Sequence, residues 1–555
     1  MAKIHTLKIK NFRCLKRFKH VFKSDDLICL IGRGDSGKTT ILNAISTVLS
    51  PNWNHSFYDT DFHNGKIKNS IKIEVTLYDL PTELLSDSKF GLYKRLINKD
   101  NKVIDDILTE DIEDSQDALT IKLVVNNDLE PRWYVTNKRE QDDVEIRAND
   151  RARLNVFIVS DYLDRHFSWS KGNPLYSLLK QLEVEIDTDK IITEANRKAK
   201  KSIKKSESFS SFDTVIDNIK SAASNLGLSS GDLEAFVDFK NTLIKEGSIS
   251  LHNGNIPFRL KGKGTKRLLS IAIQLELAKQ GGIILIDEIE QGLEPDRAKF
   301  LAKYLKDNNE GQVFFTTHSN NVLVELSAKH IFLRNNNSEK LYSFKKDFQG
   351  CLRNNPEAFF AKRVIVCEGA TEVGICRALN NYRIKNNEDN LSVLGVAYVD
   401  GNGDNFINYC LKFKKAGFDV CAFCDSDKQE IDDKKEDLRD KGIIVVDCDE
   451  NKSIEEQVFS DLPWSKIKKL VKYAIKEKSE QSILDVTGKE TIEDLLGEEN
   501  DEIRLLLGKK SKKHGWYKRI DHGEIIGKYW FKSLPNLDGT TLNTEYDNLS
   551  NWINE

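Results

Sequence analysis

Residues 32–39 read Gly32-Arg33-Gly34-Asp35-Ser36-Gly37-Lys38-Thr39. This stretch fits the pattern GxxxxGK[ST] and follows the apolar run Leu27–Ile31. Behind it, apolar residues recur at Ile41, Leu42 and Ile45, a spacing typical of one face of a helix. A strand, a glycine-rich turn and a helix in this order predict a phosphate-binding loop in an α/β domain.

The chemistry of such a loop assigns a role to each residue type. Glycines let backbone N–H groups approach phosphates at a helix N-terminus, where the helix dipole favours negative charge. Lys38 is expected to reach the β- and γ-phosphates of ATP, and the Thr39 hydroxyl to ligate Mg²⁺. The nucleotide-binding residues predicted from this loop are Gly32, Gly34, Asp35, Ser36, Gly37, Lys38, Thr39 and Thr40.

Two later segments suit ATP hydrolysis. The apolar run Ile283–Ile286 ends in Asp287, expected to bind the magnesium shell, and Glu288, expected to orient or deprotonate the attacking water. His318 follows the run Val313–Phe315, which predicts an imidazole near the γ-phosphate. An acidic strand end or a lone histidine is often structural. Together with the phosphate-binding loop, both favour a catalytic nucleotide site.

The order of these motifs resembles ABC-type ATPases of the SMC and RecF kind, and predicts such a domain over residues 1–345. Between them, the segment Lys261–Arg267 keeps two glycines before a helix but departs from the LSGGQ signature. In ABC-type ATPases the signature completes the nucleotide site of a partner subunit. The resemblance therefore implies a homodimer or higher homo-oligomer, with Gly264 at the nucleotide.

Length and composition predict several soluble domains, since 555 residues exceed what one hydrophobic core supports. No run approaches the roughly 18 apolar residues of a membrane span, so we expect a cytoplasmic protein. The net charge of -3 neither indicates nor excludes nucleic acid, because binding needs only a local basic surface. Cys421 and Cys424 lack a second ligand pair and are interpreted as strand packing rather than a zinc site.

The middle and the C-terminal half differ in pattern. Residues 174–246 are polar and lysine-rich, which predicts a helical insertion for dimerisation; its basic run Arg197–Lys201 is either a DNA contact or a solvated helix face. Residues 360–555 predict a mostly parallel sheet covered by helices, with a helical C-terminal part. The expected strands are Val364–Cys367, Val393–Val399, Val420–Cys424 and Ile443–Val446.

Acidic residues follow three of these strands. Because ligands of parallel sheets gather at the carboxyl ends of the strands, we expect the acids to meet at one edge. Adjacent carboxylates repel, and Mg²⁺ or Mn²⁺ would relieve this; two ions about 4 Å apart could stabilise phosphodiester cleavage. The acids are Glu368 after the first of these strands, Asp425 and Asp427 after the third, and Glu455 after the fourth. At the nucleotide, Thr39 and Asp287 are the expected Mg²⁺ ligands.

The order Glu-Gly-x-x-Glu, Asp-x-Asp and Ser-x-Glu resembles the Toprim domain of OLD (overcoming lysogenization defect) nucleases. The resemblance implies an α/β chain in which an ABC-type ATPase is followed by a Rossmann-like Toprim domain that cleaves DNA. It also implies that Glu368, Glu372, Asp425, Asp427 and Glu455 are metal ligands, with Ser453 assisting. In the same way it implies Glu368, Asp425 and Asp427 as catalytic residues and a late catalytic lysine. Lys518 is the best match for that lysine, with Lys513 or a merely solvated lysine as alternatives.

OLD proteins of Gabija or retron-associated antiphage systems are similar, which implies antiviral defence, regulation of cleavage by ATP, and a helicase or reverse transcriptase as partner. Two other functions remain open at this stage. One is a DNA-repair ATPase whose acidic domain lacks nuclease activity, which a metal-dependent cleavage assay would distinguish. The other is an assembly scaffold for a defence complex, which sizing with and without ATP would distinguish.

Overall fold

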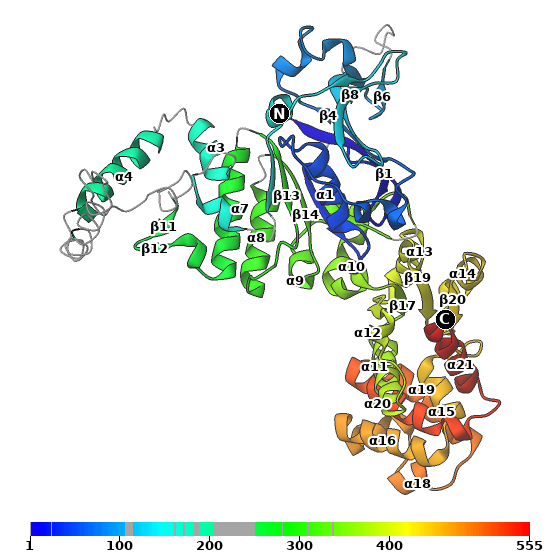
Figure 1. Cartoon of the computed structure of the whole chain (residues 1–555). Coiled ribbons are helices and arrows are strands. Elements are labelled where there is room, and N and C mark those ends of the chain that lie inside the picture. Colours follow the sequence, from blue (N-terminus) through cyan, green and yellow to red (C-terminus); the bar gives the residue numbers. More distant parts are fainter. Residues whose placement is uncertain are drawn as a thin grey trace.

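The computed structural model describes residues 2–23, 25–105, 115–159, 163–169, 173–181, 188–204, 217, 250–279, 281–308, 311–335 and 338–555. Within these residues the chain forms an α/β protein with two parallel sheets, one in each half (Figure 1). The expected fold class, an ABC-type ATPase head followed by a Toprim domain, is therefore confirmed. Among the described helices, none combines the length and the apolar character that crossing a bilayer requires.

The N-terminal half begins with an antiparallel sheet of order β2-β1-β4-β7-β5-β6, to which β8 and β9 are added through β7. A register shift between Ile4 and Thr6 interrupts the alternation of side chains along β1, and Ile4, Leu7 and Ile9 all lie in one core. The bounds are β1 (Lys3–Phe12), β2 (Leu15–Val21), β4 (Ile71–Tyr78), β5 (Arg95–Ile97), β6 (Val103–Ile104), β7 (Gln116–Val125), β8 (Pro131–Thr136) and β9 (Val144–Glu145).

The second sheet has the order β10-β13-β14-β3-β15-β16 and is parallel except for β16. Both faces of β3 are covered by helices. Ile28 and Leu30 lie in one core with α1, and Cys29 and Ile31 lie in another core with α7 and α8. This explains its continuous apolar run. The strands are β3 (Leu27–Ile31), β10 (Val156–Val159), β13 (Ile283–Ile286), β14 (Gln312–Thr316), β15 (Ile331–Leu333) and β16 (Tyr342–Ser343); the helices are α1 (Lys38–Val48), α2 (Ala148–Ala152), α7 (Lys263–Ala278), α8 (Pro295–Asp307) and α9 (Asn320–Leu323).

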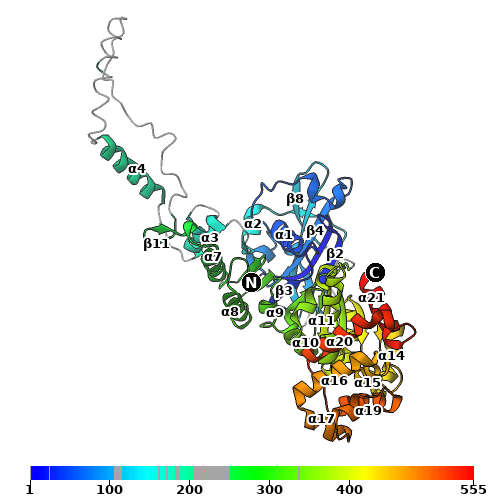
Figure 2. The same ribbon diagram turned by 90° about the horizontal axis from the view of Figure 1, so that it is seen from below.

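The helical insertion expected over residues 174–246 is described only in part, as α3 (Pro174–Gln181), α4 (Thr188–Lys204) and residue 217. In both views α4 extends away from the body of the molecule (Figures 1 and 2). The basic run Arg197–Lys201 lies on this helix. The rest of the insertion lies outside the described residues. The short strands β11 (His252–Asn253) and β12 (Ile256–Pro257) pair before α7 begins.

The C-terminal sheet is parallel and has the order β18-β17-β19-β20. One expected strand is partly wrong: the run Val393–Val399 begins as the end of α12 and turns at Gly395 (φ 73°) before β18. The strands are β17 (Arg363–Cys367), β18 (Val396–Asp400), β19 (Asp419–Phe423) and β20 (Ile444–Val446). The helices beside them are α11 (Ala370–Lys385), α12 (Leu391–Leu394), α13 (Phe406–Lys415) and α14 (Gln429–Asp440).

A helical region completes the C-terminal half. Its α20 crosses α11 at close range, because Gly374 and Gly523 leave no room for a Cβ between the two backbones. The buried Trp516 and Trp530 lie in the core that this region shares with one face of the sheet. The helices are α15 (Ile454–Asp461), α16 (Trp464–Lys478), α17 (Glu480–Thr487), α18 (Ile492–Leu496), α19 (Asp501–Lys513), α20 (Ile520–Ser533) and α21 (Thr541–Asn554).

One hydrophobic core joins the two halves. It contains Ile31 from β3 and Val364 from β17. The segment between the sheets, with α10 (Gln349–Asn354), adds Phe348, whose ring centroid lies 5.4 Å from that of Phe359 and 5.1 Å from that of Phe413 on α13. Because packed cores deform little, the phosphate-binding loop and the acidic strand ends belong to one mechanically continuous unit.

Candidate functional site

The phosphate-binding loop lies between β3 and α1, and its conformation requires glycine. Gly32 and Gly37 have φ values of 145° and 93°, which other residues rarely adopt. A Cβ at Gly32 would also lie 2.6 Å from the Arg334 carbonyl oxygen, whereas none of the described atoms would come within 4 Å of a Cβ at Gly34. The Lys38 Nζ donates to the carbonyl oxygens of Gly32 and Arg33, both at 2.9 Å. Lys38 is thus held inside the loop that it is expected to serve.

Three separate segments meet beside this loop. The Oδ1 atom of Asp287 accepts hydrogen bonds from the hydroxyls of Thr39 (3.2 Å) and Thr316 (2.7 Å). The backbone N–H of Glu288 donates to the same Thr316 hydroxyl at 2.7 Å. Glu288 is exposed, with φ 49°. The expected Mg²⁺ ligands Thr39 and Asp287 therefore lie together, with Glu288 at the solvent side.

His318 is positioned by a residue that the motifs did not identify. Glu290 accepts hydrogen bonds from the Thr317 hydroxyl (2.7 Å) and the His318 backbone N–H (2.6 Å). Burial lowers the pKa of His318, and the charge of Lys38 lowers it further. The imidazole is consequently neutral near pH 7 and able to accept a proton or a hydrogen bond.

The signature helix also supports this region. Arg267, on α7, is buried and donates to the carbonyl oxygens of Asp287 and Glu288. Gly264 packs against the backbone of Gly292, so that a side chain there would collide with it. Of the remaining expected nucleotide residues, Asp35 has φ 57°, Ser36 is buried, and the Thr40 hydroxyl lies 3.3 Å from Cys14 Sγ.

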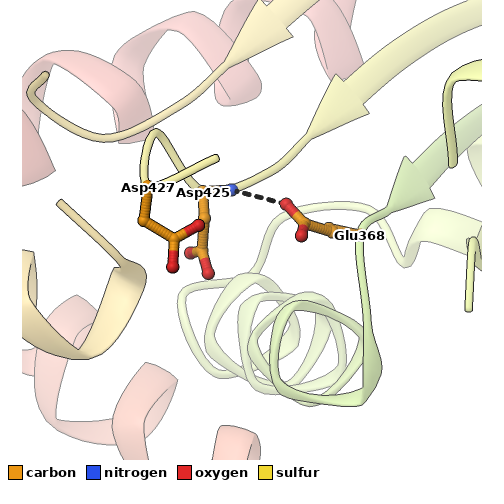
Figure 3. Close-up of side chains that lie close together, drawn as sticks. All are labelled: Glu368, Asp425 and Asp427. Atoms are coloured by element: carbon orange, nitrogen blue, oxygen red, sulfur yellow. Dashed lines mark hydrogen bonds between the residues drawn. The ribbon is translucent and has the colours of Figure 1, made fainter. Parts of the chain in front are cut away.

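The acids of the C-terminal sheet form a compact group. Glu368 follows β17, and Asp425 and Asp427 follow β19; one carboxylate oxygen from each lies within 4.8 Å of the others (Figure 3). Two hydrogen bonds fix Asp425, because its N–H donates to Glu368 Oε2 at 3.1 Å and its Oδ1 accepts from the Ile454 N–H at 2.7 Å. The carboxyl ends of adjacent parallel strands thus place these side chains together.

The other expected ligands surround this group without joining it. Glu372 is buried, and its Oε2 accepts from the Gly369 N–H (2.9 Å) at the start of α11. Ser453 caps α15, where its hydroxyl accepts from the Glu456 N–H at 3.4 Å. Glu455, in the first turn of the same helix, is fully buried.

The negative charges of this group of acids are not balanced without bound cations. Burial raises the pKa of Asp425 well above its usual range, and the charges of Glu372 and Glu455 raise it further. Burial, with Glu455 and Glu368, raises the pKa of Glu372 to about 7. Within the described residues, Asp427 Oδ1 and Glu455 Oε2 are buried and accept no hydrogen bond. Carboxylate oxygens without donors fit a hard divalent ion such as Mg²⁺.

Three lysines contact these acids. The Nζ of Lys518 lies 3.1 Å from Glu455 Oε1, whereas Lys513 makes no ion pair with these acids in the part of the chain that the structure describes. The motifs did not identify the other two, Lys428 and Lys512, which pair with Glu368 and Asp427 at 2.7 and 2.9 Å. Lys428 follows Asp427 directly, and this position next to a predicted ligand could have identified it from the sequence. No sequence pattern could have identified Lys512, because its partner Asp427 is 85 residues away.

A fourth lysine holds the loop after β19 in place. Lys435, on α14, is buried and donates to the Asp425 carbonyl oxygen (2.9 Å) and the Ser426 hydroxyl (2.7 Å). It also pairs with Asp432 (2.6 Å) and Asp447 (3.1 Å). Its charge is therefore balanced by partners within the fold.

Cys421 and Cys424, on and next to β19, are buried free thiols, as the packing interpretation expects.

Comparison with known proteins gives two family matches. Residues 27–325 match the family described as "AAA domain, putative AbiEii toxin, Type IV TA system". Residues 359–427 match the "Overcoming lysogenization defect protein-like, TOPRIM domain". The second match contains Glu368, Glu372, Asp425 and Asp427.

Several solved structures resemble the chain at low identity. An SMC head domain with an extended coiled coil, bound to the C-terminal domain of ScpA and derived from Pyrococcus furiosus, has 16% identity and a TM-score of 0.35, over 62% of this chain and 97% of that one. The recombination mediator RecF with ATP has 13% identity and a TM-score of 0.32, over 62% and 99%. The SMC head from Thermotoga maritima has 13% identity and a TM-score of 0.29, over 62% and 99%.

The AAA family match spans more than half of the 555 residues, and the TOPRIM match begins 34 residues after it ends, at 359 against 325. The first match contains the nucleotide site, and the second contains the three clustered acids Glu368, Asp425 and Asp427. The chain therefore belongs to the AAA domain family described as putative AbiEii toxin, Type IV TA system, and, with its TOPRIM domain, it is an OLD-family ATPase and metal-dependent nuclease.

Proposed function

We propose that this protein is an ATP-binding and ATP-hydrolysing, Mg²⁺-dependent DNA endonuclease whose cleavage depends on its nucleotide state. The observation that carries the proposal is the group of Glu368, Asp425 and Asp427, whose carboxylate oxygens lie within 4.8 Å of one another. Bound Mg²⁺ or Mn²⁺ would supply charge stabilisation to the attacking and leaving oxygens of phosphodiester hydrolysis.

The residues take the following roles in this proposal. Glu368, Asp425 and Asp427 hold the metal. The neighbouring carboxylates of Glu372 and Glu455 add negative charge next to the metal site. Ser453 caps the first turn of α15 and so keeps Glu455 in position. Lys518 is the catalytic lysine, supported by its 3.1 Å distance to Glu455. At the nucleotide, Lys38 binds phosphate, Thr39 and Asp287 hold Mg²⁺, Glu288 activates water, His318 contacts the γ-phosphate and Gly264 completes the site of a second subunit.

Contacts between the halves support control by the nucleotide. The Arg33 side chain, in the phosphate-binding loop, lies against Gly395 before β18. The Asn335 Nδ2 donates to the Gly417 carbonyl oxygen at 2.7 Å, between the end of β15 and the start of β19. A change of the loop on ATP binding can therefore reach β18, the neighbour of β17, which precedes Glu368. The Asn335 contact lies next to the start of β19, which precedes Asp425 and Asp427. The resemblance to Gabija-type nucleases favours inhibition of cleavage by ATP.

The wider assignments belong to the same proposal. We infer an ATPase domain (1–345) with a helical insertion for dimerisation (174–246) and a Toprim domain (360–555). A parallel sheet in each half supports the ATPase and Toprim parts of this division. Antiphage defence in the cytoplasm, as a homodimer or larger homo-oligomer with a helicase or reverse transcriptase partner, is supported by the family resemblance alone.

Plasmid cleavage tests the nuclease assignment. Purified wild type should cut DNA with Mg²⁺ or Mn²⁺, and Asp425→Ala and Glu368→Ala should each abolish cutting. Glu436→Ala, an exposed acid on α14, is the matched control and should cut like wild type. Unchanged cutting by both site variants, with folding verified by circular dichroism, would contradict the site.

A further inference from the structure

Two of the three clustered carboxylates are already paired with an ammonium group. The Nζ of Lys428 lies 2.7 Å from Glu368 Oε1. The Nζ of Lys512 lies 2.9 Å from Asp427 Oδ2 and 3.2 Å from Glu456 Oε2. The two side chains come from different elements, the N-cap of α14 and the last turn of α19. Lysines therefore pair with two of the three carboxylates that would hold a divalent ion.

These two lysines differ from the buried lysine of the same region. The Lys435 side chain is 5% exposed and has four polar partners in the fold. The side chains of Lys428 and Lys512 are 54% and 33% exposed. Lys428 has only Glu368 as a partner, among the contacts of the described residues. Their ammonium groups have solvent on one side and acids on the other, so each can turn to solvent without becoming a buried unpaired charge. The buried carboxylate that it leaves would be compensated by the divalent ion.

The distances suit an exchange of partners. An oxygen-ligated Mg²⁺ lies about 2.1 Å from a carboxylate oxygen and the same distance from a bound phosphate oxygen. A phosphate oxygen on that ion would thus lie within about 4 Å of the carboxylate, within reach of an ammonium group that turns away from that carboxylate. The divalent ion repels the ammonium group, and the phosphate attracts it.

We propose that Lys428 and Lys512 hold the metal-site carboxylates of Glu368 and Asp427 in the metal-free protein, yield them to divalent ions, and then bind backbone phosphates of the nucleic acid strand. The proposal rests on the proposed nuclease function and adds two phosphate-binding residues to it. It assigns each lysine two partners, one before and one after the metal binds. A purely structural ion pair would keep the same partner in both states.

The first half of the exchange predicts competition between lysine and metal. Mn²⁺ binding to the full chain is measured by titration without nucleic acid, for wild type, Lys428→Ala and Lys512→Ala. Both variants should bind Mn²⁺ about two- to fivefold more tightly, since an exposed ion pair is a weak competitor. The controls are Lys434→Ala and Lys509→Ala, exposed on the same two helices, and their Mn²⁺ affinity should equal that of wild type.

The second half predicts a phosphate contact that exists only with metal. The affinity for a fluorescein-labelled DNA duplex is measured against salt concentration, once in Ca²⁺ and once in EDTA. Affinity falls as salt concentration rises, so the slope of log affinity against log salt is negative. In Ca²⁺, this slope should be less steep by about 0.9 in each lysine variant, which is the effect of losing one phosphate contact. In EDTA the slope should not change, because the lysine is then bound to its carboxylate.

Both results together support the exchange, as does recovery of the Ca²⁺ slope in Lys512→Arg, which keeps the charge. Unchanged or weaker Mn²⁺ binding in both alanine variants would overturn it, and so would salt slopes in Ca²⁺ equal to that of wild type. Neither measurement needs turnover. A wild type that fails to cut DNA would therefore count against the proposed function and leave these two readouts valid.

Discussion

The guanidinium group of Arg33, in the phosphate-binding loop, lies against Gly395 of the C-terminal half so closely that a Cβ at Gly395 would collide with it. Gly395 has φ 73° and separates α12 from β18, the neighbour of the strand that ends in Glu368. The contact thus joins the nucleotide loop to the sheet that carries the acids, within one side-chain length.

This contact predicts that Arg33→Ala uncouples the two sites. The cleavage rate is measured across an ATP titration at fixed free Mg²⁺. The rates of wild type and Glu288→Gln should change with ATP concentration. The rate of Arg33→Ala should stay within about twofold of its ATP-free value, which corresponds to a change in activation free energy below about 0.5 kcal/mol. ATP binding should persist, because the side chain faces Gly395. Equal ATP responses in wild type and Arg33→Ala would refute the path through this contact.

Lys38 and Glu288 should separate ATP binding from ATP hydrolysis. Lys38→Ala should weaken ATP binding about ten- to hundredfold, since a hydrogen bond to a charged group contributes about 1.5–3 kcal/mol. Glu288→Gln should bind ATP normally and hydrolyse it slowly, because its exposed carboxylate activates water. Nucleotide-binding titrations and phosphate release distinguish the two. Equal loss of binding in both variants would contradict the roles.

Glu290 should affect hydrolysis through His318. Glu290→Gln weakens the acceptor that holds the Thr317 hydroxyl and the His318 N–H, so ATP turnover should fall about tenfold, a change of about 1.4 kcal/mol, with little effect on ATP affinity. Turnover is measured by phosphate release at saturating ATP. Glu294→Gln, exposed four residues later, serves as the control and should turn over like wild type.

The acidic group predicts opposite stability orders with and without metal. Burial and neighbouring acids raise the pKa of Asp425, so its charged form destabilises the metal-free protein. Asp425→Asn should therefore raise the melting temperature in EDTA by a few degrees. Addition of Mg²⁺ should raise the melting temperature of wild type more than that of the variant. Differential scanning fluorimetry measures both. A variant less stable than wild type in EDTA would contradict the repulsion.

Glu545, on α21, predicts a pH dependence of stability. Burial, followed by the charge of Asp447, raises its pKa from 4.5 to about 7. Between these values the folded state keeps a proton that the unfolded chain has lost, so its contribution to stability falls as pH rises from 4.5 to 7. Relative to Glu545→Gln, wild type should lose on the order of 1 kcal/mol across this window, allowing for solvent screening.

Urea unfolding of both proteins at pH 4.5, 6 and 8 measures this difference. Glu502→Gln, exposed on α19, is the control and should follow wild type at every pH. A constant difference between wild type and Glu545→Gln over the whole range would show that Glu545 keeps its ordinary titration in the folded state.

The sequence by itself determined the features that depend on neighbouring residues. The glycines of residues 32–37 fit a loop with φ values that glycine adopts freely, and apolar runs that end in acids predicted where strands stop. Because parallel strands share one carboxyl edge, the meeting of Glu368 with Asp425 followed from order alone. The break at Gly395 was missed, because α12 is only four residues long and its left-handed C-cap, Gly395, lies inside an otherwise apolar run.

Only the tertiary structure decided which side chains from distant elements meet. Glu372 and Glu455 share the predicted edge but lie outside the compact group of three acids, whereas Lys512 reaches Asp427 from a helix whose own pattern shows no such partner. The physical reason is that hydrophobic periodicity specifies which face of a helix is buried. The angle at which α19 crosses α15, and thus the acid that Lys512 reaches, comes from the packing of the assembled core.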